Sequence, residues 1–78
     1  MDPKDLITQI AQALVEHPEQ VSVSEIKSED TVIFQLTVSK GDRGRVIGKH
    51  GRTADALRTI VYAVAGKSRK RFLLEIND

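Results

Sequence analysis

The spacing of apolar residues changes repeatedly along this chain, and the order of these changes limits its fold more than any other feature. Apolar residues recur at helical spacing in some segments and alternate with polar residues, as in strands, in others. The spacing predicts helix, strand, strand, helix, helix and strand over residues 4–16, 20–27, 31–39, 43–47, 52–65 and 69–76. We therefore expect an α+β fold with helices packed on one face of a three-stranded sheet.

The ends of these segments carry residues that commonly begin or end a helix. Asp2 is placed to cap the first helix, and Pro18 closes it. Asp42 occupies the N-cap position of the short helix, and Gly66 the C-terminal position of the long one. With 78 residues, the chain has room for one domain, residues 1–78.

Charge is unevenly distributed, although the formal net charge is only +1. Residues 1–39 carry two basic and seven acidic side chains, a balance of −5, whereas residues 40–78 carry ten basic and four acidic, a balance of +6. Such asymmetry is typical of a protein that binds a polyanion, although it also fits a solvated surface. The basic residues gather in two groups: Lys40, Arg43, Arg45, Lys49 and Arg52, and then Lys67, Arg69, Lys70 and Arg71.

Composition argues against several kinds of site. The chain has no cysteine, and His17 and His50 match no metal-ligand spacing, so we expect no metal. No catalytic constellation can be assembled from the sequence, so we expect neither an enzyme nor a cofactor. No apolar run approaches the ~20 residues of a membrane span, and the N-terminal segment lacks the pattern of a signal peptide. We therefore expect a cytoplasmic protein.

The most informative segment is Gly48-Lys49-His50-Gly51, between two predicted helices. Its glycines allow a turn that other residues resist, and they lack the Cβ atoms that would hold a ligand away. The following helix begins here, so its unpaired N–H groups and its dipole face the same place. Lys49 and Arg52 add positive charge. This combination predicts a backbone surface for phosphate; a tight helix–helix turn without a ligand is the alternative.

Other glycine-rich phosphate loops do not fit. Gly44 and Gly48 are separated by three residues and followed by Lys49 and His50, whereas a Walker A loop has four residues and then Lys and Ser or Thr. No Gly-x-Gly-x-x-Gly segment follows a strand, which argues against dinucleotide binding.

The segment Val46-Ile47-Gly48-Lys49-His50-Gly51, with Leu57 and Ile60 further on, resembles the signature of KH domains. In that family such a loop clamps about four nucleotides of single-stranded backbone. The element order is similar to the type II KH arrangement, and the resemblance covers nearly the whole chain. Residues 41–51 and 58–62 resemble the bacterial KhpA type of single-KH protein. The resemblance implies an RNA chaperone or post-transcriptional regulator that acts with KhpB and is linked to cell shape and peptidoglycan homeostasis.

The resemblance also implies roles for the residues around the loop. Val46 and Ile47 would form an apolar floor for bases, whose edges the backbone of a neighbouring strand would read. Ile33, which faces away from the other apolar residues of its strand, would belong to that floor or to a second packing contact. The second basic group is either a solvated strand entry or an extension of the RNA track. The expected RNA-binding residues are Gly48, Lys49, His50, Gly51, Arg52, Arg43, Arg45, Val46 and Ile47.

The long helix is apolar around more than one side. Four of its residues recur at the spacing of a core stripe: Leu57, Ile60, Val61 and Val64. Alanines and a tyrosine widen this stripe, so we expect a homodimer, or a heterodimer with KhpB. The contact surface would comprise Arg58, Val61, Tyr62 and Ala65.

Two other functions stay open. The aromatic residues Phe34, Tyr62 and Phe72 form no cluster that could stack bases, which separates the chain from RRM and OB-type binders and predicts weak base discrimination. Nothing in the sequence marks recognition of the RNA 2′-hydroxyl, so single-stranded DNA is an alternative ligand. A protein-interaction module that has lost its nucleic-acid role is the other alternative.

Overall fold

The helices and strands occur in the predicted order, and the computed structural model describes residues 2–66 and 69–78. The predicted bounds of the short and long helices that flank the loop are confirmed, and the other bounds agree to within two residues. In chain order the elements are α1 (Pro3–Leu14), the 3-10 turn η1 (Pro18–Gln20), β1 (Ser22–Lys27), β2 (Thr31–Thr37), the 3-10 turn η2 (Lys40–Asp42), α2 (Arg43–Ile47), the 3-10 turn η3 (Lys49–Gly51), α3 (Arg52–Ala65) and β3 (Arg71–Asn77).

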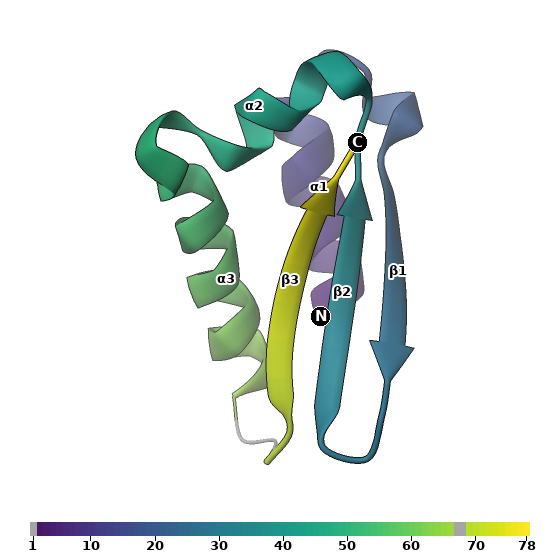
Figure 1. Cartoon of the computed structure of the whole chain (residues 1–78), viewed down its shortest axis with the longest axis vertical. Helices are drawn as coiled ribbons and strands as arrows, with labels where there is room; N and C mark the ends of the chain where they lie inside the picture. Colours follow the sequence, from purple (N-terminus) through teal and green to yellow (C-terminus); the bar gives the residue numbers. More distant parts are fainter. Residues whose placement is uncertain (1, 67–68) are drawn as a thin grey trace.

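The sheet has β2 at its centre. β2 pairs antiparallel with β1, as the predicted hairpin requires, and parallel with β3. A parallel pair needs a long crossover connection, and α2 and α3 provide it. The strand order β1-β2-β3 places β3 at an edge of the sheet, and α3 runs beside it in the opposite direction (Figure 1).

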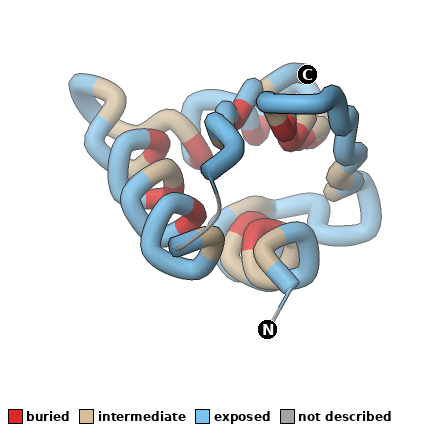
Figure 2. Tube along the Cα trace, turned by 90° about the horizontal axis from the view of Figure 1, so that it is seen from below, coloured by how far each residue is buried: buried red, intermediate tan, exposed pale blue. Residues whose placement is uncertain are grey.

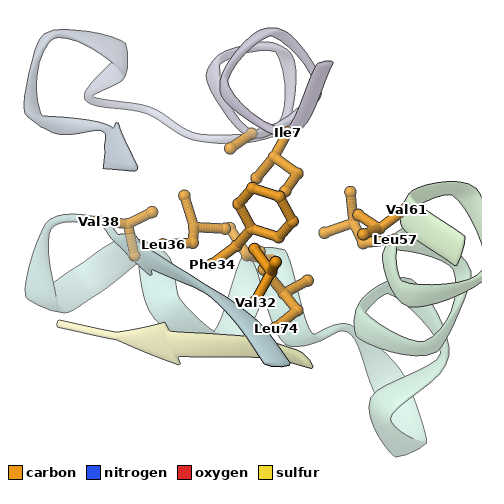
Figure 3. Close-up of a cluster of buried hydrophobic side chains, with 10 residues drawn as sticks. Ile7, Val32, Phe34, Leu36, Val38, Leu57, Val61 and Leu74 are labelled. Carbon is orange, nitrogen blue, oxygen red and sulfur yellow. The ribbon is translucent and has the colours of Figure 1, made fainter. Parts of the chain in front are cut away.

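The core lies between the sheet and the helices. Phe34 at its centre is fully buried, and its ring stacks on that of Phe72 with 6.2 Å between the centroids. Ile7 from α1 and Leu57 and Val61 from α3 point toward Phe34 (Figure 3). Viewed from below, the buried residues of the helices and of the sheet face one another across this interior (Figure 2). This packing confirms that the helices cover one face of the sheet.

Within the part of the chain that the structure describes, no helix covers the opposite face of the sheet (Figure 1). Ile33 lies on this face, where the strand register places it between Ile26 of β1 and Leu73 of β3. Ile26 and Leu73 are both exposed. Of the two roles expected for Ile33, its position beside Ile26 and Leu73 fits the second packing contact.

Only part of the apolar stripe predicted for α3 enters the core. Leu57 and Val61 are buried, but the exposed fractions of Ile60 and Val64 are 37% and 41%. Val61 therefore cannot belong to a dimer surface as predicted, because the core already encloses it. Among the described residues, no helix is long and apolar enough to cross a bilayer.

Two of the predicted helix caps are confirmed, and the third, Asp42, occupies the predicted N-cap position without a capping hydrogen bond. Asp2 Oδ1 accepts a hydrogen bond from the N–H of Lys4 at 2.9 Å, and Gly66 ends α3 with a φ of 43°. The side chain of Asp42 does not cap α2. It turns instead toward the C-terminal end of α1, where it is buried.

Asp42 joins three separate segments. Its carboxylate accepts hydrogen bonds from the N–H of Glu16 at 3.1 Å, the N–H of His17 at 3.0 Å and the hydroxyl of Ser39 at 2.8 Å. Because these two N–H groups turn to Asp42, the helix stops at Leu14, two residues earlier than predicted. The carboxylate thereby fixes the end of α1 against the segment that leads into α2.

The same contacts set the charge of Asp42. Burial raises the pKa of its carboxyl, but the hydrogen bonds from Glu16, Ser39 and His17, together with the charge of His17, lower it by more. The pKa of Asp42 therefore lies below its ordinary value of 3.8. At neutral pH the side chain is a fixed anion beside α2.

Candidate nucleic-acid interface

The loop between α2 and α3 turns almost entirely through left-handed backbone. Gly48, His50 and Gly51 have φ angles of 76°, 58° and 73°. Glycine adopts this region at little cost, and histidine is among the side chains that tolerate it. The sharp turn leaves Lys49 and His50 exposed at one end of the molecule.

The two glycines are needed for different reasons. A Cβ atom on Gly48 would lie 2.8 Å from the Cβ of Thr53 and 3.0 Å from its backbone nitrogen, so the close packing of loop and helix requires glycine. A Cβ on Gly51 would meet nothing within 4 Å. Gly51 is therefore required for its positive φ, and the space beside it is open to a ligand.

The loop uses some of its amides internally and leaves others unused. The N–H of Gly48 donates to the carbonyl of Gly44 at 2.9 Å, and the N–H of Gly51 donates to the carbonyl of Gly48 at 3.1 Å. Within the part of the chain that the structure describes, the N–H groups of Lys49 and His50 have no hydrogen-bond partner. Two adjacent amides of this kind, on two exposed residues, suit an anion.

A groove of about 540 Å³ begins at the loop and lies between the helices and the edge of the sheet. α2 and α3 form one wall and the last residues of β3 the other. Its lining residues are Arg43, Ile47, His50, Gly51, Ala54, Asp55, Arg58, Leu74, Glu75, Ile76 and Asn77.

The outer edge of β3 faces this groove with alternating backbone groups. The N–H of Arg71 and the carbonyl of Asn77 bond toward the β2 side, so the residues of the other parity present their N–H and C=O groups outward. Arg58 Nη2 meets the outward carbonyl of Leu74 at 3.4 Å, a long hydrogen bond. The backbone of Ile76 is thereby directed into the groove, with one donor and one acceptor.

The structure brings most of the predicted RNA-binding residues to one place. Gly48 and Gly51 form the turn, and Lys49 and Arg52 are exposed beside it. The other predicted residues that line the groove are Arg43, Ile47 and His50.

Two predicted residues lie elsewhere. Val46 is fully buried in the core, because α2 is a helix of one turn and directs it inward while Ile47 faces the groove. Val46 therefore cannot form part of a floor for bases. Arg45 turns away from the loop, where its Nη2 meets Glu16 Oε1 at 2.8 Å and its Nε meets Asp42 Oδ1 at 3.5 Å.

Arg58, which was expected on the dimer surface, lines the groove. Its Nη1 meets Asp55 Oδ1 at 3.2 Å while its Nη2 reaches across to β3, so the side chain spans the floor. Arg58 follows Gly51 by seven positions, or about two turns of α3, which places both on one side of the helix. That spacing was available in the sequence, but the position of β3 beside it was not.

No group of three or more metal-ligating side chains occurs among residues 2–66 and 69–78. Of the second basic group, Arg69, Lys70 and Arg71 lie at the opposite end of the sheet from the loop, and Lys67 lies outside the described residues.

Comparison with known proteins agrees with this geometry. A family model described as the KH domain of KhpA and KhpB matches residues 4–76. The chain is 48% identical over 73 residues to a protein of Listeria monocytogenes named "RNA-binding protein KhpA", covering 94% of this chain and 96% of that one. It is 49% identical over 75 residues to the protein of the same name from Halalkalibacterium halodurans, covering 96% and 99%. The corresponding protein of Chlamydia muridarum is 42% identical over 75 residues. No solved structure matches the chain.

Proposed function

Because this chain belongs to the KhpA/KhpB family of KH domains, we propose that it binds single-stranded RNA without catalysis, as an RNA chaperone or post-transcriptional regulator in the cytoplasm. Residues 1–78 act as one KH domain, in which the Gly48–Gly51 loop clamps the RNA backbone. The relatives named as RNA-binding proteins match over nearly their full length and over nearly all of this chain.

The observation that carries this proposal is the pair of unused amides beside the groove. A phosphate placed against the loop accepts hydrogen bonds from the N–H groups of Lys49 and His50. Lys49 and Arg52 supply positive charge from the loop and the first turn of α3, and Arg43 supplies it from α2. Asp55 adds little repulsion, since it is paired with Arg58.

Bases of the bound strand lie in the groove on aliphatic side chains. Ile47 provides apolar contact, and the N–H and C=O groups of Ile76 meet the donors and acceptors on base edges. More than one type of base can pair with a single backbone N–H and C=O, so the expected sequence discrimination is weak. Single-stranded DNA fits this scheme as well, because the contacts do not involve the 2′-hydroxyl.

Salt dependence tests this proposal. Four phosphate contacts predict that the logarithm of affinity falls with the logarithm of salt concentration at a slope of about −3. Fluorescence anisotropy with a short labelled single-stranded RNA at several salt concentrations measures the slope, and single-stranded DNA of the same sequence serves for comparison. An affinity that does not change with salt contradicts a phosphate clamp.

Association through α3 is a second part of the proposal. Ile60 and Val64 lie one turn apart on the same side of α3 and are exposed, whereas Val61 is in the core. We place the contact with a second copy, or with KhpB, on the Ile60–Val64 side of the helix. Two weak sites on one RNA then gain affinity through effective concentration. From its family, we also propose for the chain a link to cell shape and peptidoglycan homeostasis.

Light scattering at high micromolar concentration tests the homodimer. The chain should show the mass of two copies, and Ile60→Asp should reduce it to one, because a charge at the contact costs desolvation. Ser24→Asp, on the uncovered face of the sheet, is the matched control. A single-copy mass for the unaltered chain contradicts this homodimer.

A further inference from the structure

The seam between α3 and β3 continues beyond the groove. A second hollow of about 170 Å³ is lined by Tyr62, Ala65, Gly66, Lys70 and Phe72. α3 and β3 run in opposite directions (Figure 1), so the seam passes later residues of α3 and earlier residues of β3 as it leads away from the loop. The second hollow therefore lies beyond the end of the groove that Arg58 and Leu74 line.

Tyr62 is placed to meet a strand that leaves the groove. It follows Arg58 by four positions, so both side chains lie on the same side of α3, about 6 Å apart along its axis. Tyr62 is 49% exposed, whereas Phe34 is buried at the centre of the core. Its ring thus offers an accessible aromatic surface one helical turn beyond the groove.

Positive charge surrounds the far end of the seam. Lys70 lines the second hollow, and Arg69 and Arg71 on either side of it are exposed. Phosphates of a single strand that passes Tyr62 would meet these side chains. An accessible aromatic ring beside cations is the arrangement by which proteins hold single-stranded nucleic acid by stacking and charge.

We infer that the RNA strand held by the loop continues along this seam, with a further base stacked on Tyr62 and its phosphates near Arg69 and Arg71. This inference rests on the proposed function and extends the binding site beyond the nucleotides that the loop clamps. Tyr62 thereby belongs to the RNA site, on the side of α3 that Ile60 and Val64 do not share. The inference also assigns Arg69 and Arg71 of the second basic group to the RNA track.

Tyr62 reports directly on this contact, since it is the only tyrosine and the chain has no tryptophan. Two unlabelled oligoadenylates serve as probes: one of about four nucleotides, the length that a KH loop holds, and one about twice as long. The longer RNA should quench the fluorescence of Tyr62, and the shorter one should bind without quenching it. Free N-acetyltyrosinamide corrects for absorption by adenine.

Substitution separates stacking from other effects. Tyr62→Leu should weaken binding of the longer RNA roughly tenfold and leave the affinity for the shorter one unchanged, because one stacked base is lost. Tyr62→Phe keeps the aromatic face and should retain the affinity. Ile26→Ala, an exposed apolar position on the uncovered face of the sheet, is the matched control and should change neither.

Three results overturn this inference. The first is binding of the longer RNA without quenching. The second is an equal loss of affinity for both lengths in Tyr62→Leu, and the third is a change of oligomeric mass in that variant without loss of affinity for the longer RNA. If the unaltered chain binds neither RNA, the proposed function itself fails.

Discussion

Replacing Lys49 and His50 together with aspartate should abolish RNA binding and leave the melting temperature near that of the parent chain. Both side chains are exposed, and neither makes a hydrogen bond or ion pair within the described residues. The change removes a cation and places two carboxylates where a phosphate is expected. Like charges at an interface cost several kcal/mol, so affinity should fall about a hundredfold or more.

The folded state should tolerate this double substitution. His50 has left-handed backbone, and aspartate is among the residues that accept that conformation. Fluorescence anisotropy gives the affinity, and circular dichroism gives the melting temperature. Lys4→Asp with Gln12→Asp changes the net charge by the same amount on α1, away from the groove, and serves as the control. If the control loses as much affinity as the loop variant, the loop does not bind the RNA backbone as proposed.

Asp42→Asn should have the largest effect on stability of the changes considered. Asparagine keeps the shape of the side chain but loses its charge. It also replaces one carboxylate oxygen, which accepts hydrogen bonds, with an NH2 group that can only donate them. The N–H groups of Glu16 and His17 and the hydroxyl of Ser39 all point at the carboxylate oxygens. We expect a lower melting temperature at neutral pH, since a buried donor without a partner is costly. Ser39→Ala removes one of these bonds and should have a smaller effect.

The same carboxylate should make stability depend on acid. The pKa of Asp42 is lower in the folded chain than its ordinary value of 3.8, so the folded state favours the charged form. The stability that the Asp42 carboxylate contributes is complete at pH values above 3.8. It is lost as the pH falls below 3.8 through the lower pKa of Asp42 in the folded chain. Thermal unfolding across this pH range should show the loss in the parent and not in Asp42→Asn. Equal melting temperatures of the parent chain and Asp42→Asn at neutral pH would contradict a stabilising role for the Asp42 carboxylate.

The local features of the site could be predicted from the sequence. The glycines at positions 48 and 51 determine where α2 ends and α3 begins, and Gly66 determines where α3 ends, so those bounds are correct. Local chemistry dominates at such positions, because a positive φ excludes most side chains. The exposure of Lys49 and His50 follows from the same turn.

The groove could not be predicted because it depends on contacts between distant segments. The parallel pairing of β3 with β2 places the outer edge of β3, and the backbone of Ile76 with it, opposite Arg58. No spacing within the sequence specifies that pairing. Asp42 shows the same limit, since its partners Glu16 and His17 lie more than twenty residues away and outweigh its local role as a helix cap.

The central claim is that the amides of Lys49 and His50 contact the RNA backbone. Nuclear magnetic resonance of the isotope-labelled chain, titrated with a short single-stranded RNA, follows these two amides individually. We expect their resonances to shift most, together with that of Ile76 in the groove. Shifts confined to the uncovered sheet face around Ile33 or to the Ile60–Val64 side of α3, with both loop amides unmoved, would contradict it.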